Sequence, residues 1–288
     1  MVMKTPSEDK QIYFHVGLAK TATTWLQLKV FPQFHGIFYV KNTSYHRYAS
    51  IIERTNHPKY LVSREFDRQL EREVTRFSER YPEAHPIIVL RRHESWIASQ
   101  YRRRVKNGFG RPFEDFFDLD RDRGYWKQID LFLHPKLLVL ERHLRQKPLV
   151  LFYEDLKADP TGFVDRIARF CGAEYDRSRV SLDPFHASYG DKSLKVLRRV
   201  SPYLFSPVQE FSGPRVWQRV QKLSRSLVVY AILYPSLLLP DRWVPKEDLI
   251  PKEYLDRIRK RYAEDWRQCR EYAEKLQSQE VEPRTKAG

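Results

Sequence analysis

Five short apolar runs, each followed by a helical pattern or a loop, constrain the fold of this chain more than any other feature. Each run has four to six residues and is rich in valine, isoleucine, phenylalanine and tyrosine. They cover Gln11–Val16, Gly36–Val40, Lys59–Val62, Pro86–Leu90 and Pro148–Tyr153. Several do not alternate apolar with polar residues, which is typical of strands buried on both faces of a parallel sheet.

Helical patterns lie between these runs. They cover Thr21–Val30, Arg64–Arg80, His93–Lys106, Tyr125–Leu133 and Pro160–Cys171. Strands that alternate with helices predict βαβ units, and therefore an α/β fold with a central parallel sheet and right-handed crossovers.

The strand signal fades after about Gly172, and helical patterns resume at Ser193–Val200, Pro214–Leu233 and Pro251–Leu276. We expect the last of these to be an amphipathic helix that packs on the sheet domain. The predicted organisation is a flexible N-terminus over 1–10, an α/β core over 11–180, a C-terminal helical part of the same domain over 181–276, and a flexible tail over 277–288.

Composition narrows the class of partner. The formal net charge of +15 predicts a surface that attracts anions such as nucleotides, acidic glycans, nucleic acid or anionic lipid. The two cysteines, Cys171 and Cys269, lie far apart in helical patterns, which argues against a disulfide framework or a zinc site. The polar segment 1–10 has no apolar signal core, so we predict a cytoplasmic protein.

The longest apolar stretch, Leu227–Leu239, is too short to span a bilayer and contains Pro235. A core or domain-packing helix is the favoured interpretation. The alternative is peripheral membrane contact through residues 219–239, where Arg219, Lys222 and Arg225 flank the stretch.

The first apolar run leads directly into a phosphate-binding pattern. Gly17 permits a sharp turn, and backbone N–H groups at the start of the following helix would face an anion. Lys20 supplies a mobile positive charge, while Thr21, Thr23 and Thr24 offer hydroxyl donors. The strand–loop–helix arrangement is therefore P-loop-like. It is not a Walker A motif, because Ala19 rather than glycine precedes the lysine.

The segment His15–Gln27 resembles the first signature of the sulfotransferase family, in the form of a bacterial-looking member. Enzymes of that family use 3′-phosphoadenosine 5′-phosphosulfate (PAPS) as sulfonyl donor and need no metal. The family usually has proline at position 19 and often glycine at 22, where this chain has alanine. The resemblance implies donor contacts from Gly17, Lys20, Thr21, Ala22, Thr23, Thr24 and Trp25.

A second signature follows the fourth run. Arg91 comes directly after the predicted strand, and Ser99 lies eight residues later in a predicted helix. This pair resembles the family's clamp for the 3′-phosphate of the donor. Arginine suits the role because its planar guanidinium binds phosphate through two parallel hydrogen bonds.

A third match, Leu149–Pro160, resembles a structural segment of the family. There we expect Glu154 to anchor a buried polar contact, and Asp159 with Pro160 to begin the next helix.

The resemblance also implies roles in transfer. Lys20 would neutralise charge on the leaving phosphate oxygen, and the acceptor hydroxyl needs a general base. Glu65, directly after the third run, is the first choice for the base, and His46 is the reserve. Lys192 is a further candidate contact to the nucleotide. The acceptor is predicted to be a carbohydrate or a glycolipid, acidic or lipid-linked.

Two other classes of function remain as alternatives. The loop and Lys20 also fit a P-loop nucleotide kinase or NTPase, although the second glycine of that motif is missing. The positive charge alone fits a protein that binds nucleic acid or a membrane surface. Because the basic residues are dispersed and no nucleic-acid-binding module is recognisable, we expect no specific nucleic acid partner.

Overall fold

The computed structural model describes residues 10–181, 190–205 and 215–281. The chain forms two compact units, each assembled from separate stretches. The first contains Met1–Arg92, Phe132–Phe185 and Tyr262–Gly288, and the second contains His93–Leu131 and His186–Arg261. Residues 93–131, which we assigned to the 11–180 core, thus group with most of the C-terminal helices.

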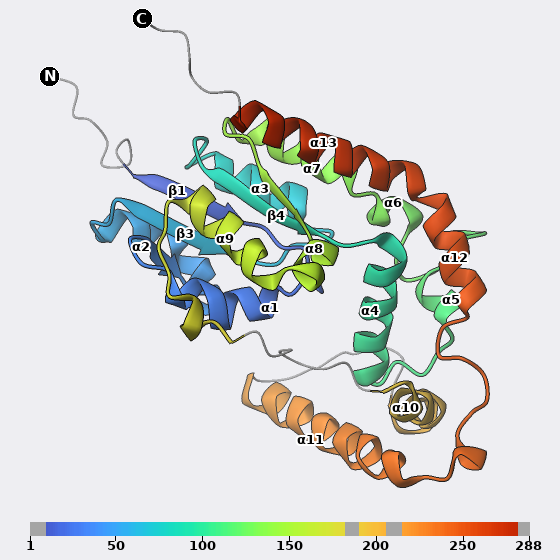
Figure 1. Cartoon of the computed structure of the whole chain (residues 1–288). Helices are drawn as coiled ribbons and strands as arrows, with labels where there is room; N and C mark the ends of the chain where they lie inside the picture. The colour runs from blue at the N-terminus through green and yellow to red at the C-terminus, as the bar shows by residue number, and fades with distance from the viewer. Residues whose placement is uncertain (1–9, 182–189, 206–214, 282–288) are drawn as a thin grey trace, which may run out of the picture. The chain divides into compact units, whose positions relative to one another are not determined.

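A five-stranded parallel sheet forms the centre of the first unit, in the order β2-β3-β1-β4-β5 (Figure 1). Its strands are β1 (Gln11–His15), β2 (Phe38–Val40), β3 (Lys59–Ser63), β4 (His85–Leu90) and β5 (Leu149–Phe152). All five predicted strands are confirmed, as is the α/β fold class. The chain builds β2 and β3 on one side of β1 and then crosses to build β4 and β5. This reversal falls beside β1, which is where ligands bind in open parallel sheets.

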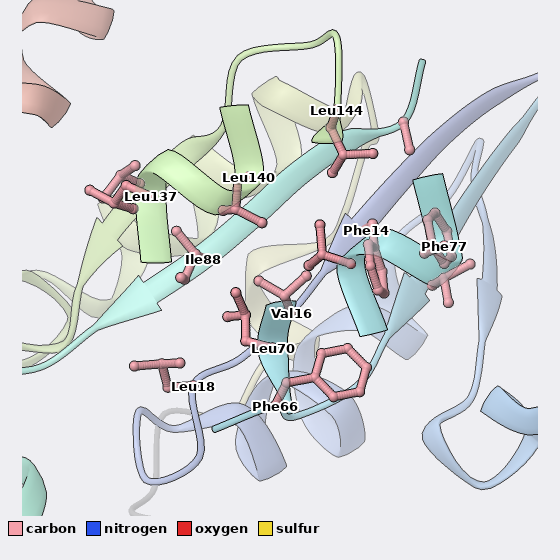
Figure 2. Close-up of a cluster of buried hydrophobic side chains, with 14 of the residues drawn as sticks. Phe14, Val16, Leu18, Phe66, Leu70, Phe77, Ile88, Leu137, Leu140 and Leu144 are labelled. Carbon is pink, nitrogen blue, oxygen red and sulfur yellow. The ribbon is translucent and has the colours of Figure 1, made fainter. Parts of the chain in front are cut away.

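Both faces of the sheet are buried, as the continuous apolar runs predict. Ile12, Phe14 and Val16 point into one hydrophobic cluster, whereas Tyr13 belongs to the cluster on the opposite face. In the first cluster the ring of Phe77 stacks on that of Phe14, with 3.7 Å between their centroids (Figure 2). Side chains of α3 (Leu70–Ser78), α7 (His134–His143) and α13 (Ala263–Val281) complete this cluster.

The opposite face is covered by the helical segment after β1 and by α9 (Pro160–Cys171). That segment consists of α1 (Thr23–Trp25), the π-helical η1 (Leu26–Val30) and the 3-10 helix η2 (Phe31–Gln33). The remaining short helices of this unit are η3 (Asn42–Arg47), α2 (Tyr48–Arg54), α8 (Tyr153–Ala158) and η4 (Arg177–Arg179).

Several helices differ from the predicted ranges. The helix predicted over Arg64–Arg80 is limited to α3, because residues 64–66 continue alongside β1 and residues 67–69 form the turn before α3. The predicted helix over Pro251–Leu276 is divided at Tyr262 into α12 (Lys252–Arg261) and α13. As predicted, α13 packs on the sheet unit through Cys269 and Ala273, and it continues to Val281, into the predicted tail.

The described part of the second unit is helical. It contains α4 (His93–Lys106), α5 (Phe113–Phe116), α6 (Gln128–Leu131), α10 (Asp191–Leu204), α11 (Arg215–Leu233), η5 (Pro235–Leu238), η6 (Asp241–Trp243) and α12. Helix α4 packs against α10 and α12. The fully buried Tyr101 of α4 donates a hydrogen bond to the carbonyl of Arg111 at 2.8 Å.

Candidate functional site

The loop after β1 begins inside the sheet, because the hydrogen bonding of β1 to its neighbours continues beyond His15. The N–H of Leu18 donates to the carbonyl of Val89 at 3.1 Å, and the N–H of Phe66 donates to the carbonyl of Val16 at 3.0 Å. Gly17 adopts φ +103°, and a Cβ there would lie 3.2 Å from backbone atoms of Glu65 and Phe66. Glycine is therefore required for the conformation and for the close approach.

The carbonyl of Leu18 closes the loop on itself. It accepts hydrogen bonds from the hydroxyl groups of Thr21 at 2.6 Å and Thr23 at 2.7 Å, and both threonines are buried. A hydroxyl group has only one proton to donate. The hydroxyl protons of Thr21 and Thr23 are thus used within the loop, whereas Thr24 is exposed at the start of α1.

Two non-glycine residues of the loop adopt the left-handed conformation, Lys20 with φ 66° and Ala22 with φ 64°. Left-handed residues next to right-handed ones turn successive backbone N–H groups toward a common point, an arrangement that binds anions. The geometry also explains the family's preference for glycine at position 22, because glycine adopts positive φ without steric cost.

Arg91 lies against this loop. Its guanidinium donates to the carbonyl of Lys20 at 2.9 Å and stacks over the ring of Tyr153, 4.3 Å from the centroid. The neighbouring Arg92 is turned elsewhere, with its guanidinium 5.3 Å from the ring centroid of Trp266 in α13. The strand β4 therefore delivers Arg91, not Arg92, to the edge of the sheet where the loop lies.

Two acidic residues of the segment after β3 lie beside the loop, Glu65 through its backbone and Asp67 through its carboxylate. The backbone of Glu65 touches Gly17, so the predicted base is positioned beside the loop. Asp67 accepts a hydrogen bond from the N–H of Ala19 at 3.2 Å. Sequence reasoning did not select Asp67, although its place after the third apolar run carries the same signal as that of Glu65. His46 is exposed in η3.

A chain of hydrogen-bonded polar groups, from the buried His15 to the exposed Arg64, lies next to the loop. His15 Nδ1 lies 2.8 Å from the hydroxyl of Ser63, which also accepts from the amide of Gln27 at 3.0 Å. Asn42 donates to Gln27 at 3.2 Å and accepts from Arg64 at 2.6 Å. Burial lowers the pKa of His15 to about 3, so this imidazole is neutral at physiological pH. His15 thus has a structural position, as expected for a residue inside a strand.

Three residues that the sequence predicts to contact the donor are found outside the loop's hydrogen-bond network. Trp25 is buried, and its indole N–H donates to the carbonyl of Ser181 at 2.9 Å. Ser99 and Lys192 belong to the second unit, where Ser99 is half-buried in α4 and the ammonium of Lys192 is paired with Asp241 at 2.9 Å. The roles of these three residues in donor binding stay predictions.

The third sequence match has the expected start of α9, whereas the contact made by Glu154, which we expected to be buried, is exposed. Glu154 accepts a hydrogen bond from the N–H of Arg92 at 3.1 Å, and thereby fixes the turn after β4. Asp159 caps α9 by accepting from the N–H of Gly162 at 2.8 Å, with Pro160 in the first turn.

Within 10–181, 190–205 and 215–281, no group of three or more His, Cys, Asp or Glu residues is arranged to hold a metal ion. Over the same residues, no helix combines the length and the apolar character that crossing a bilayer requires.

Three comparisons relate the chain to known proteins, and the family model among them agrees with the sequence signatures. The chain is similar to the crystal structure of a sulfotransferase from Alicyclobacillus acidocaldarius, with 16% identity and a TM-score of 0.47 over 78% of this chain and 95% of that one. A search of curated proteins gave no match. The model of the sulfotransferase domain matches residues 13–193, which is more than half of the chain and includes most of β1, all of β2 to β5 and the loop. The protein therefore belongs to the sulfotransferase domain family and is a transferase.

Proposed function

We propose that the protein transfers a sulfonyl group from PAPS to an acceptor hydroxyl and releases adenosine 3′,5′-bisphosphate. The observation that carries the proposal is the closed loop from Gly17 to Thr24, with the guanidinium of Arg91 on the carbonyl of Lys20. The loop gathers backbone N–H groups and an ammonium, and the arginine adds a second cation at the same edge of the sheet. Two cationic residues suit a donor that carries phosphate at both its 5′ and 3′ positions.

Transfer of this kind depends on positioning and charge stabilisation rather than on covalent help from the protein. The acceptor oxygen forms a bond to sulfur while the bond between sulfur and the 5′-phosphate oxygen breaks. The backbone N–H groups of residues 20–24 and the exposed Thr24 hydroxyl hold the phosphosulfate. The ammonium of Lys20 stabilises the negative charge on the leaving phosphate oxygen, and Arg91 holds the 3′-phosphate, together with Ser99 as the family resemblance implies.

The acceptor proton passes to a carboxylate in this proposal. Glu65 is the base because its backbone touches the turn at Gly17 and it follows β3, at the edge of the sheet where the loop lies. Asp67 has a different task, since it accepts a hydrogen bond from the loop and holds the N–H of Ala19. The exposed His46 is the alternative base.

We propose a carbohydrate or glycolipid as acceptor, on the basis of the net charge of +15. A positively charged protein raises the local concentration of acidic saccharides through long-range attraction. A cytoplasmic location is part of the same proposal.

Calorimetric titration with adenosine 3′,5′-bisphosphate tests the donor site without knowledge of the acceptor. We expect binding that does not require magnesium, and a loss of about 10- to 100-fold in affinity in Arg91→Ala, because a charged hydrogen bond is worth about 1.5–3 kcal/mol. Arg92→Ala is the matched control, since it removes the adjacent guanidinium, which is turned toward Trp266. Its affinity should equal that of the wild type.

The same titration with magnesium and ATP distinguishes the rival class. Preference for magnesium-ATP over the bisphosphate, or equal losses in the two arginine variants, would contradict the proposal and favour a P-loop kinase or NTPase.

A further inference from the structure

Helix α11 of the second unit presents a continuous apolar surface to solvent. The exposed positions recur at intervals of three and four residues, so they lie on one face of the helix. They are Val216, Val220, Leu223, Leu227, Tyr230 and Tyr234. Leu223 and Leu227 are 64% and 63% exposed. The turn after the helix adds Leu237 and Leu238, the latter 88% exposed. We call these eight residues the apolar stripe.

The stripe is distinct from the face that stabilises the helix. Val229 and Leu233 are buried and lie about 100° or more around the helix from the centre of the stripe. Helix α11 packs against α10 and η5, and Figure 1 shows α11 beside α10. Folding of the second unit therefore already uses one side of this helix. The other side leaves large aliphatic side chains in water, which soluble proteins rarely do over a contiguous area.

Charge around the stripe has one predominant sign. Helix α11 contains four basic residues and no acidic residue, namely Arg215, Arg219, Lys222 and Arg225. Arg219 is exposed beside the stripe, and the ammonium of Lys106 lies 5.5 Å from the ring centroid of Tyr230. Asp241, the acidic residue nearest the stripe in sequence, is paired with Lys192.

Exposed aromatic side chains lie within the stripe and close to it in sequence. Trp217 at the start of α11 and Trp243 in η6 are 57% and 64% exposed, and the rings of Tyr230 and Tyr234 stack at 5.9 Å. Tryptophan and tyrosine prefer the boundary between lipid headgroups and acyl chains, because each has an apolar body and a polar group.

We infer that the apolar stripe binds the surface of a membrane that contains anionic lipid, with α11 lying in the plane of the interface. An apolar face, basic residues beside it and exposed tryptophans close to it in sequence are the combination that such helices use. A second copy of the chain fits less well, because stripe-to-stripe packing would bring Arg219 and Lys106 of both copies together with no acidic residue on either α11 helix. The inference does not depend on the proposed donor.

Co-sedimentation of the full chain with vesicles tests the inference. We expect binding to vesicles of phosphatidylglycerol and phosphatidylcholine, and at least about tenfold weaker binding to phosphatidylcholine alone, because each basic residue near an anionic surface strengthens attraction severalfold. The variant Leu223→Ser/Leu227→Ser should bind the anionic vesicles at least about tenfold more weakly. Ile129→Ser is the matched control, because Ile129 of α6 is also an aliphatic side chain, 70% exposed, in the same unit. It should bind as the wild type does.

Circular dichroism and bisphosphate affinity, unchanged in both variants, would show that the fold and the donor site are intact. Failure of the wild type to bind anionic vesicles would overturn the inference, as would equal binding by the wild type and the double variant. Sedimentation velocity tests whether the stripe instead mediates self-association of the chain. Self-association that the double substitution abolishes, without vesicle binding by the wild type, would assign the stripe to contact between copies.

Discussion

The loop after β1 and the stripe on α11 use side chains in opposite ways. In the loop, Thr21 and Thr23 are buried, and their hydroxyl groups are bonded to one carbonyl. On α11, the most conspicuous side chains are apolar and face solvent. The polar groups of these threonines find their hydrogen-bond partner inside the folded unit, whereas the apolar side chains of the stripe need a binding partner to leave water. Substitutions in the loop should therefore change stability or chemistry, and substitutions in the stripe should change association alone.

The largest expected effect concerns the base. Glu65→Gln keeps the size of the side chain but removes its ability to take a proton, and general base catalysis contributes about 10²- to 10⁴-fold. We expect a loss of that size in the release of inorganic sulfate from PAPS, with water in place of the acceptor. Affinity for the bisphosphate should not change.

Leu227→Ser, in the stripe, is the control for this measurement and should release sulfate at the wild-type rate. An unchanged rate in Glu65→Gln would move the assignment of the base to His46.

Gly17→Ala tests the difference between the loop and the stripe by its effect on the free energy of unfolding. The added methyl group would lie 3.2 Å from the backbone of Glu65 and Phe66 at φ +103°, so either the turn or the segment after β3 must shift. We expect the free energy of unfolding, measured with urea, to fall by about 2–4 kcal/mol. Leu227→Ser should change it by less than about 0.5 kcal/mol, because that side chain is already in water. A loss of more than about 2 kcal/mol in Leu227→Ser would show that the stripe belongs to the core.

The sequence predicted the loop better than the stripe, and the reason is physical. Five continuous apolar runs and a strand–loop–helix pattern specify a parallel sheet with its site at the carboxyl ends of the strands. That was enough to bring Lys20, Glu65 and Arg91 to one edge. The bonds of Thr21 and Thr23 to Leu18 could not be predicted, because hydroxyl groups in such a loop can serve either the backbone or a ligand.

For helix α11, the sequence could not predict which side is exposed. Its apolar residues fall on two sides of the helix, and periodicity alone does not tell which side is covered by the rest of the unit. Packing against α10 and η5 decides this, and it depends on segments that are separate in sequence. The long charged helix at the C-terminus was predicted as one element for a related reason: Tyr254, Tyr262 and Trp266 keep helical spacing across the break between α12 and α13.

His15 offers a test of intermediate size. The pKa of its imidazole is about 3 in the folded chain and near 6.5 when unfolded, so only the unfolded chain takes up the proton as pH falls below 6.5. Stability from this group is therefore complete above pH 6.5 and is lost toward pH 3. The free energy of unfolding should fall by about 2 kcal/mol between pH 7 and pH 5 from His15 alone.

His15→Gln isolates this contribution, because glutamine does not titrate and its amide can still bond to Ser63. Urea unfolding at both pH values should show a difference between pH 7 and pH 5 that is about 2 kcal/mol smaller in the variant. Equal pH dependence in the two proteins would mean that the folded state tolerates a protonated His15. Water would then reach the hydrogen-bonded groups around His15.

The smallest effect is expected at Ala22, where this chain departs from the glycine that is frequent in the family. A left-handed alanine costs about 1–2 kcal/mol, and the greater entropy of glycine in the unfolded chain takes back about 0.4–1 kcal/mol. Ala22→Gly should therefore raise the free energy of unfolding by about 0.5 kcal/mol, measured by urea at pH 7. Because φ at this position is already 64°, affinity for the bisphosphate should stay the same. If the Ala22→Gly variant were less stable, or bound the bisphosphate more weakly, then Ala22 would rigidify the loop for its ligand. The loop, like the stripe, would then have side chains that serve binding.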